Sequence, residues 1–273
     1  MLKTRIITAL LLVAVLLPVL FLSSNIVWAS VTLVISLLTV NEWGKLINLT
    51  PKNVVYYTII SAILGIALLW AMTVNGFHWL IYQSLFIFVL TLLFWILVAP
   101  VLLTKLVVIK NQFLLAIIGL FLICPLWLAL ICLKGIDPWL LLTLLMTIWV
   151  ADTAAYFFGK FFGKHKLAPS ISPGKTWEGV FGALIGVTLL GGILYFNTLV
   201  STWAIFILLW LVALLGVVGD LFESLVKRQM NKKDSGDLLP GHGGILDRID
   251  GLIPSLPIAV LIIYLFNYFQ VGH

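Results

Sequence analysis

The sequence predicts an all-α, polytopic integral membrane protein, a helical bundle of about nine transmembrane helices with its N-terminus in the cytoplasm. Three observations predict this fold. Of the 273 residues, 63% are hydrophobic and only 10% are charged, whereas soluble domains are about half apolar and about a quarter charged. The mean hydropathy is +1.21. The apolar residues also gather in runs of about 20, the length of a helix that crosses a bilayer. This composition excludes a soluble globule, a disordered chain and a disulfide-rich secreted module.

Nine apolar segments follow one another, separated by connectors with turn signals such as Asn75-Gly76. The first segment follows Lys3 and Arg5, as in a signal peptide, but no small-residue cleavage site is apparent, so we expect a retained anchor. The short break at Ser23-Ser24-Asn25 leaves open whether the first two segments form one bent hairpin. We place the nine segments near residues 6–22, 26–40, 54–74, 79–99, 113–132, 138–158, 178–196, 203–223 and 252–270.

The basic residues are distributed very unevenly between the two sides of such a bundle. With nine spans, every Lys and Arg except Lys134 falls on the side of the N-terminus, and the positive-inside rule makes that side cytoplasmic. We therefore expect a multi-pass protein of the cell inner membrane whose basic loops face the cytoplasm. The net charge of +6 then reflects topology, and we expect no nucleic-acid partner. Cys124 and Cys132 lie in one apolar run and are interpreted as buried packing residues.

The acidic residues divide the chain into two regions. Only Glu42 lies in the first half, so residues 1–135 are expected to form a transmembrane scaffold. Residues 136–273 carry the other acids and are expected to form the catalytic region, with cytoplasmic loops at residues 159–177 and 224–251.

Two spans of the second region carry charges inside their apolar runs. An acid within a span costs about 2.5–3.5 kcal/mol unless it faces a polar cavity, so Asp152 is expected to line a site. The alternative is an acid that reaches the membrane interface or is hydrogen-bonded inside the bundle. Four polar residues of the eighth segment share one helix face at spacing i, i+3, i+4 and i+7. They predict a polar wall of a site, with an interfacial stripe and an internal ion pair as the alternative. They are Asp220, Glu223, Ser224 and Lys227.

The first loop, residues 159–177, is lysine-rich. Ser172, Lys175 and Thr176 offer hydroxyl and ammonium donors just before a predicted helix, with Glu178 in its first turn. A helix N-terminus favours phosphate because of its free N–H groups and partial positive charge. The loop is not a P-loop, because it lacks the upstream glycine and a preceding strand. A basic loop that touches anionic lipid head groups is the alternative.

The second loop, residues 224–251, gives the more specific signal. Asp247 and Asp250 are three apart and share one side of a helical turn; magnesium typically uses one or two carboxylates together with substrate phosphates and water. Gly243 and Gly244 belong to a glycine-rich run that lets backbone approach a ligand closely. His242 in this run is a catalytic candidate, although a lone histidine is more often structural. The cations that could neutralise phosphate oxygens are Lys227, Arg228, Lys233 and Arg248.

Acids for a metal and cations for phosphates at a membrane surface are typical of phosphoryl or nucleotidyl transfer. A transporter or flippase for an anionic lipid is an alternative, but it predicts polar residues along several spans or broken helices near the midplane. Here the charges collect toward one side of the predicted bundle, which favours an enzyme with a soluble co-substrate.

Three stretches resemble the phosphatidate cytidylyltransferase family, also called CDP-diglyceride synthases: residues 151–160, 171–179 and, above all, Ser224 to Asp250. The resemblance implies the reaction CTP + phosphatidate → CDP-diacylglycerol + pyrophosphate, by attack of the lipid phosphate on the α-phosphorus of CTP. It also implies an integral membrane homodimer that needs Mg²⁺, with K⁺ as a candidate second cation, and it places the metal on Asp220 and Asp247. A CDP-alcohol phosphatidyltransferase would need a D-x-x-D-G-x-x-A-R-type array, which is not found.

The candidate site residues fall into two groups. The catalytic candidates are Asp220, Asp247, Asp250, Lys227, Arg248 and His242, with Asp220 and Asp247 also as metal ligands. The substrate-binding candidates are Asp152, Ser172, Lys175, Thr176, Glu178, Ser224, Arg228, Lys233, Asp234, Gly243 and Gly244.

Overall fold

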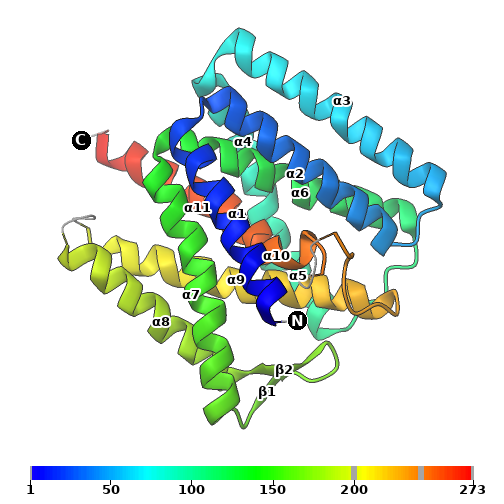
Figure 1. Ribbon diagram of the computed structural model, residues 1–273, viewed down its shortest axis with the longest axis vertical. Coiled ribbons are helices and arrows are strands. Elements are labelled where there is room, and N and C mark those ends of the chain that lie inside the picture. The colour runs from blue at the N-terminus through cyan, green and yellow to red at the C-terminus, as the bar shows by residue number, and fades with distance from the viewer. Residues whose placement is uncertain (1, 198–201, 239–242, 272–273) are drawn as a thin grey trace.

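The computed structural model describes residues 2–197, 202–238 and 243–271, and it is a bundle of long helices (Figure 1). Eight helical segments of the described chain are long and apolar enough to cross a membrane, and helix α1 precedes them. Together they correspond to the nine predicted segments, so the all-α polytopic fold is confirmed. The helices are α1 (Leu2–Leu22), α2 (Asn25–Leu46), α3 (Pro51–Asn75), α4 (Phe77–Leu93), α5 (Ala99–Thr104), α6 (Gln112–Ile136), α7 (Pro138–Phe162), α8 (Trp177–Phe196), α9 (Ala204–Gln229), α10 (Leu246–Ile249) and α11 (Leu252–Val271).

Two of the spans are composite. A π-helical turn, η1 (Phe94–Val98), joins α4 to α5, so that Phe77–Thr104 forms one span. The last span runs over Leu246–Phe266 and combines the single turn α10 with α11. The break at α10 positions two of the predicted acids, because Asp247 lies in this turn and Asp250 is its C-cap.

Five of the described helices start where a side chain accepts one of the free N–H groups of the first turn. Five such N-caps accept a backbone N–H at distances of 2.9 to 3.3 Å, and a proline follows two of them at the first helical position. The capping residues are Ser24, Thr50, Asn111, Asp137 and Thr176. Ser24 therefore starts a separate helix α2, which resolves the open question of a single bent hairpin.

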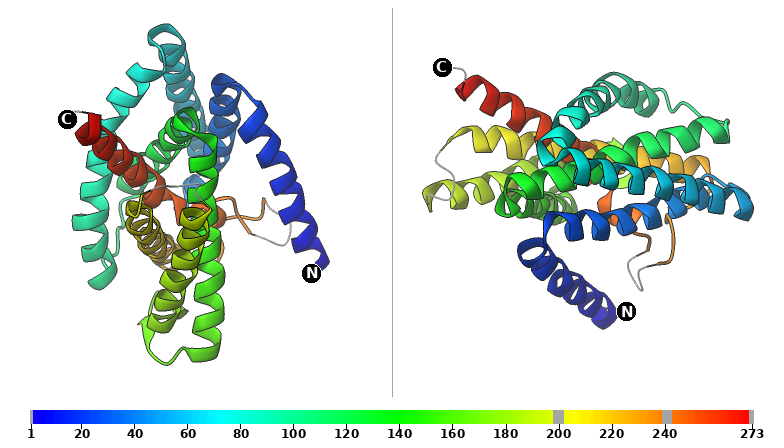
Figure 2. Two further views of the ribbon diagram at one scale, coloured as in Figure 1. Left: turned by 90° about the vertical axis from the view of Figure 1, so that its left-hand side faces the viewer. Right: turned by 90° about the horizontal axis from the view of Figure 1, so that it is seen from above.

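Helix α1 diverges from the remaining helices along most of its length (Figure 2). It meets them near its C-terminal end, where Leu20 is fully buried and the rings of Phe21 and Trp139 are 4.5 Å apart. Lys134 lies at the same end of the bundle: its ammonium donates to Ser23 O at 2.7 Å and to Asn25 Oδ1 at 3.1 Å. The one basic residue on the predicted outer side is thus used to hold the α1–α2 turn.

Helices α2 and α6 are joined by indole hydrogen bonds in the buried interior. Three Trp Nε1–H groups donate to carbonyl oxygens of the opposite helix at 2.8 to 3.1 Å. The pairs are Trp28 to Leu130, Trp43 to Leu115 and Trp127 to Ala29. Cys132 is buried in this core and Cys124 is partly buried, and both are free thiols, as predicted.

A two-stranded antiparallel sheet stands between α7 and α8. Strand β1 (Lys166–Ala168) pairs with β2 (Ser172–Thr176), and β2 leads directly into α8. The sequence-based statement that no strand precedes this helix is therefore wrong. The short hairpin pairs backbone groups of an exposed polar loop that would otherwise depend on water alone.

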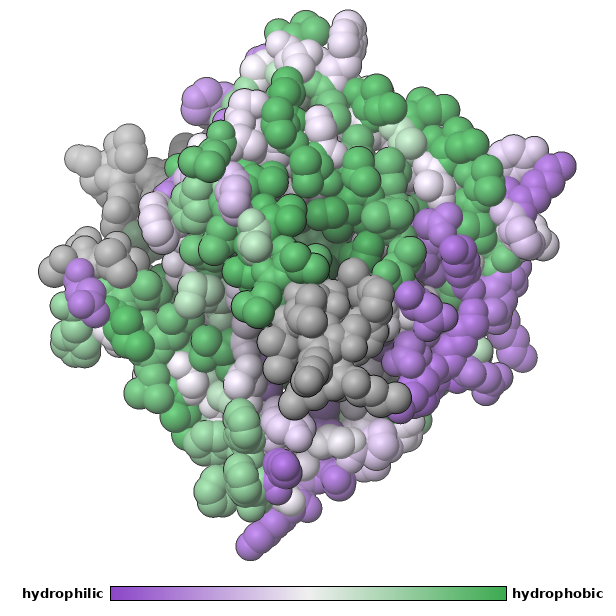
Figure 3. Space-filling model, viewed as in Figure 1, coloured by the Kyte–Doolittle hydropathy of each residue, from purple (hydrophilic) through white to green (hydrophobic). Residues whose placement is uncertain are grey.

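Hydrophilic residues gather mainly along one side of the molecule (Figure 3). In the view of Figures 1 and 3 this side includes the end of α9, the adjoining loop after it and the β1–β2 hairpin, whereas most of the remaining surface is hydrophobic. The two predicted polar loops therefore lie at one end of the bundle.

Candidate functional site

Helix α9 presents two polar turns on one face, as the sequence spacing predicts. Ser224 Oγ donates to Asp220 Oδ1 at 3.2 Å, and Lys227 Nζ donates to Glu223 Oε2 at 2.7 Å. In each i, i+4 pair one side chain also forms an ion pair with a residue outside the helix: Asp220 with Lys175, and Lys227 with Asp247. The set of Lys175, Asp220 and Ser224 is called the Asp220 cluster below, and the set of Glu223, Lys227 and Asp247 is called the Lys227 cluster.

The Asp220 cluster joins the first loop to α9. Lys175 Nζ lies 2.7 Å from Asp220 Oδ2 and 3.4 Å from the carbonyl oxygen of Val217. About two turns beyond Asp220 on α9, Arg228 Nε donates to the carbonyl oxygen of Ile171 at 3.3 Å. The side chains of Asp220 and Lys175 are 36% and 23% exposed, so this cluster stays open to incoming groups.

Three acids from three elements gather around this cluster. The carboxylates of Asp152 on α7, Asp220 on α9 and Asp250 after α10 repel one another, and Lys175 attracts Asp152 and Asp250. Among the residues that the structure describes, no three His, Cys, Asp or Glu side chains already form a set of metal ligands. Mg²⁺ needs only one or two carboxylates when phosphates and water complete its shell, so the donor chemistry here fits that ion.

The Lys227 cluster is much more enclosed. Lys227 Nζ lies 2.7 Å from both Glu223 Oε2 and Asp247 Oδ1. The side chains of Lys227, Glu223 and Asp247 are 12%, 3% and 10% exposed. In the described part of the chain, Glu223 Oε1 is a buried atom without a hydrogen-bond partner. Lys227 thus neutralises protein carboxylates in this structure, and its predicted role toward phosphate stays a prediction.

Asp247 organises the second loop. Its Oδ2 accepts the backbone N–H groups of Ser235 and Gly244 at 3.0 and 2.9 Å, while its Oδ1 accepts from Lys227. Gly243 has φ +80°, a conformation that side chains rarely adopt, and a Cβ at this position would lie 2.9 Å from Asp247 Oδ2. The glycine-rich run therefore approaches the protein's own carboxylate, and its predicted approach to a substrate remains untested.

Residues of the first loop hold the start of α8. The Thr176 hydroxyl oxygen accepts the N–H of Gly179 at 3.1 Å. Glu178 accepts the backbone N–H of His165 at 3.2 Å and lies 2.6 Å from His165 Nδ1. Ser172 begins β2, opposite Ala168. Glu178 is therefore in the first helical turn as predicted, and these contacts fix the hairpin that carries Lys175.

The remaining predicted residues lie around these clusters. Lys233 and Asp234 are exposed in the second loop, and Arg248 is exposed on α10, where it attracts Asp152. His242 lies outside the described residues.

The sequence interpretation missed Glu42. This acid lies near the C-terminal end of α2, its residue is only 1% exposed, and its carboxylate accepts the N–H groups of Ile245 and Leu246 at 3.0 and 2.9 Å. The available signal was a lone acid just past the second apolar segment, two residues beyond its predicted end at residue 40. It had been assigned to the scaffold because no other acid lies near it in the sequence.

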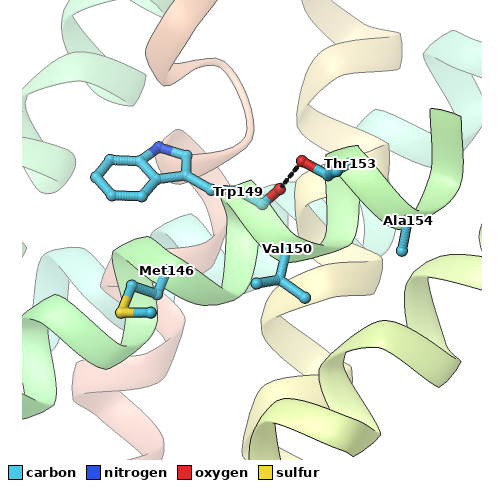
Figure 4. A pocket seen from close by; sticks show the side chains of 5 residues that line it. All are labelled: Met146, Trp149, Val150, Thr153 and Ala154. Carbon is cyan, nitrogen blue, oxygen red and sulfur yellow. Dashed lines mark hydrogen bonds between the residues drawn. The ribbon is translucent and has the colours of Figure 1, made fainter. Parts of the chain in front are cut away.

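An open apolar pocket of about 340 Å³ lies along α7 (Figure 4). Its five lining side chains all come from α7, and the Thr153 hydroxyl among them donates to the carbonyl oxygen of Trp149 at 2.7 Å. None of the predicted site residues lines it, so we place the candidate site at the charged clusters. The lining residues are Met146, Trp149, Val150, Thr153 and Ala154.

Comparison with known proteins gives consistent matches. A family model described as the cytidylyltransferase family matches residues 3–266. The chain is 42% identical over 151 residues to a phosphatidate cytidylyltransferase of Pseudomonas aeruginosa, covering 54% of this chain and 56% of that protein. It is 48% identical over 143 residues to the Haemophilus influenzae protein of the same name, covering 49% and 47%. The chain thus spans about half the length of the curated relatives it matches.

Proposed function

The chain belongs to the cytidylyltransferase family, and from this premise we propose that it is a phosphatidate cytidylyltransferase that converts CTP and phosphatidate into CDP-diacylglycerol and pyrophosphate. The observation that carries the proposal is the open Asp220 cluster, where Lys175 from the first loop pairs with Asp220 of α9 at one end of a bundle of membrane-spanning helices, with Asp152 and Asp250 from two further elements close enough to repel Asp220. A site of this kind can receive a water-soluble nucleotide while the acyl chains of the lipid remain in the bilayer.

The reaction needs little acid–base chemistry. A non-bridging oxygen of the phosphatidate phosphate forms a bond to the α-phosphorus of CTP, while the bond from that phosphorus to the oxygen bridging to the β-phosphate breaks and pyrophosphate leaves. The attacking oxygen is already ionised near neutral pH, so no strong general base is required. The main barrier is repulsion between two anions, and Lys175, Arg228 and Arg248 are placed to offset phosphate charge around Asp220.

We propose Mg²⁺ as the cofactor, with Asp220 and Asp247 as its carboxylate ligands and K⁺ as a candidate second cation. When bound, Mg²⁺ supplies positive charge to the phosphate oxygens. The partly exposed Asp220, next to Asp152 and Asp250, supports this assignment. Each oxygen of Asp247 already accepts two hydrogen bonds, from Lys227, Ser235 and Gly244, so its role as a ligand requires that Lys227 or a loop amide give way.

The orientation and assembly are also proposals. We place the site on the cytoplasmic face of the inner membrane, in a homodimer, supported for the orientation by the bias of Lys and Arg to one side. Cysteines introduced at His165 and at Asp137 should be labelled from opposite sides of the membrane, with position 165 reacting from the cytoplasm. Labelling of both from one side would contradict the topology.

The activity itself is tested with the purified protein in detergent, supplied with phosphatidate and CTP labelled in its α-phosphate. We expect the label to enter the lipid fraction only when both substrates and Mg²⁺ are present. Diacylglycerol in place of phosphatidate serves as the control, because it lacks the attacking phosphate. Folded protein that transfers no label to phosphatidate would refute the proposed function.

A further inference from the structure

The N-terminal half of the chain contributes one charged group to the surroundings of the site. Glu42 is almost completely buried, yet its two carboxylate oxygens each accept a backbone N–H from the turn that starts α10: Oε1 from Ile245 and Oε2 from Leu246. A carboxylate removed from water is costly unless hydrogen bonds replace its solvation. The two backbone N–H donors therefore replace part of the solvation that burial removes from Glu42.

The second loop is shaped around this carboxylate. A Cβ added at Gly236 would lie 2.9 Å from Glu42 Oε1, and one added at Gly244 would lie 2.7 Å from Glu42 Oε2. Two glycines thus allow the loop backbone to close over Glu42 from both sides. Gly236 and Gly244 lie in two parts of the loop that are separated in the sequence by residues 239–242. Their shared contact with Glu42 therefore joins these two parts.

We infer that Glu42 is a positioning residue for the turn α10, fixing from the N-terminal half of the chain the two acids, Asp247 and Asp250, that this turn carries. Asp247 directly follows Leu246, whose N–H is bound by Glu42, and Asp247 in turn accepts the N–H of Gly244 at 2.9 Å. Asp250 closes the same turn through its N–H to the carbonyl oxygen of Leu246 at 3.0 Å. Loss of the Glu42 anchor frees the beginning of the segment on which both acids stand.

The inference concerns geometry, and its catalytic consequence rests on the proposed function. It does not require Glu42 to touch a substrate or a metal. A residue that only stabilises the fold would change unfolding without a specific effect on α10 or on turnover, and this difference defines the test.

The experiment compares the full-length protein with Glu42→Ala and Glu42→Gln. Glutamine keeps one acceptor oxygen at nearly the same place, whereas alanine leaves the Ile245 and Leu246 N–H groups without their acceptor. Amide hydrogen exchange of peptides covering residues 231–250 is the first readout, and kcat and KM in the labelled-CTP assay are the second. Asp137→Asn is the matched control, because Asp137 also accepts a helix-start N–H, at 2.9 Å from Trp139, but at the far end of α7 from Asp152.

In Glu42→Ala we expect the Ile245 and Leu246 amides to exchange at least about tenfold faster, and kcat to fall about 10- to 100-fold, the range typical of residues that orient ligands. The KM for CTP should change less than kcat, and Glu42→Gln should recover part of both losses. The control should leave exchange in residues 231–250 and kcat unchanged.

Unchanged exchange at these amides, or faster exchange with normal kcat, would overturn the inference. If Glu42→Ala does not fold, Glu42→Gln decides by the same two readouts. If the unmodified protein transfers no label from CTP, the proposed function fails on its own, and hydrogen exchange still decides whether Glu42 holds the turn.

Discussion

The Asp220 cluster and the Lys227 cluster lie one helical turn apart on α9, and both contain an acid paired with a lysine at 2.7 Å. They differ in their surroundings. In the Asp220 cluster the partner lysine comes from an exposed hairpin and the acid is partly open, whereas in the Lys227 cluster the lysine is enclosed between two acids. A solvent-exposed ion pair contributes little to stability, but removing one partner from a buried pair leaves a costly unpaired charge. The same pair of residue types is therefore open to incoming groups in one place and holds the second loop in the other.

Lys227→Met should have the largest effect, because it removes the cation shared by Glu223 and Asp247. We expect a loss of about 3–5 kcal/mol in the free energy of unfolding, together with loss of activity. The measurement is thermal unfolding of the purified protein in detergent. Lys166→Met, at an exposed position in β1, is the matched control and should unfold like the original protein. A melting temperature unaffected by Lys227→Met would break the distinction between the clusters.

Asp220→Asn should separate function from stability. We expect turnover to fall by about 100-fold or more, because the substitution removes a carboxylate charge at the centre of the open cluster. Unfolding should change by less than about 0.5 kcal/mol, as for a partly exposed pair. Partial recovery of turnover at high Mg²⁺ concentration would indicate weakened metal binding. An equal loss of stability in Asp220→Asn and Lys227→Met would show that the two clusters do not differ as described.

Alanine substitutions at two glycines test how tightly the loops beside the two clusters are packed. Gly244→Ala places a Cβ against Glu42 Oε2 and Ser235 Oγ, whereas a Cβ at Gly174, in the hairpin before Lys175, meets no atom within 4 Å. We expect Gly244→Ala to destabilise the protein by about 1–3 kcal/mol through this overpacking, and Gly174→Ala to be nearly neutral. Chemical or thermal unfolding of the two variants side by side checks the difference; equal stability would contradict it.

Lys175→Met should have the smallest effect. The loss of one charge-assisted hydrogen bond to a bound phosphate is expected to raise the KM for CTP by about tenfold, with an unchanged melting temperature. Lys175→Arg keeps the positive charge and should retain most of the affinity. If both variants bind CTP like the original protein, Lys175 serves only to hold the hairpin against α9.

Local patterns were sufficient for part of the site. The spacing predicted that Asp220, Glu223, Ser224 and Lys227 share one helix face, and they do, because residues three and four apart on a helix are neighbours. The contact of Lys227 with Glu223 is the internal ion pair of the alternative interpretation. The turn α10 was expected for the same reason, from the spacing of Asp247 and Asp250. By contrast, the pairing of Lys227 with Asp247 joins residues 20 apart in sequence. Helical periodicity does not predict which of the several cations in this region will pair with Asp247.

By itself, the sequence determined the membrane-spanning helices, their order and the region that holds most of the charge, since these depend on the length of apolar runs and on spacing within single helices. The tertiary structure decided which charges are enclosed and which stay open, and it brought Glu42 from α2 to the start of α10, across 204 positions of sequence. The physical reason is that the environment of a charge depends on helices packed against it from elsewhere in the chain. Only their arrangement in space fixes those contacts.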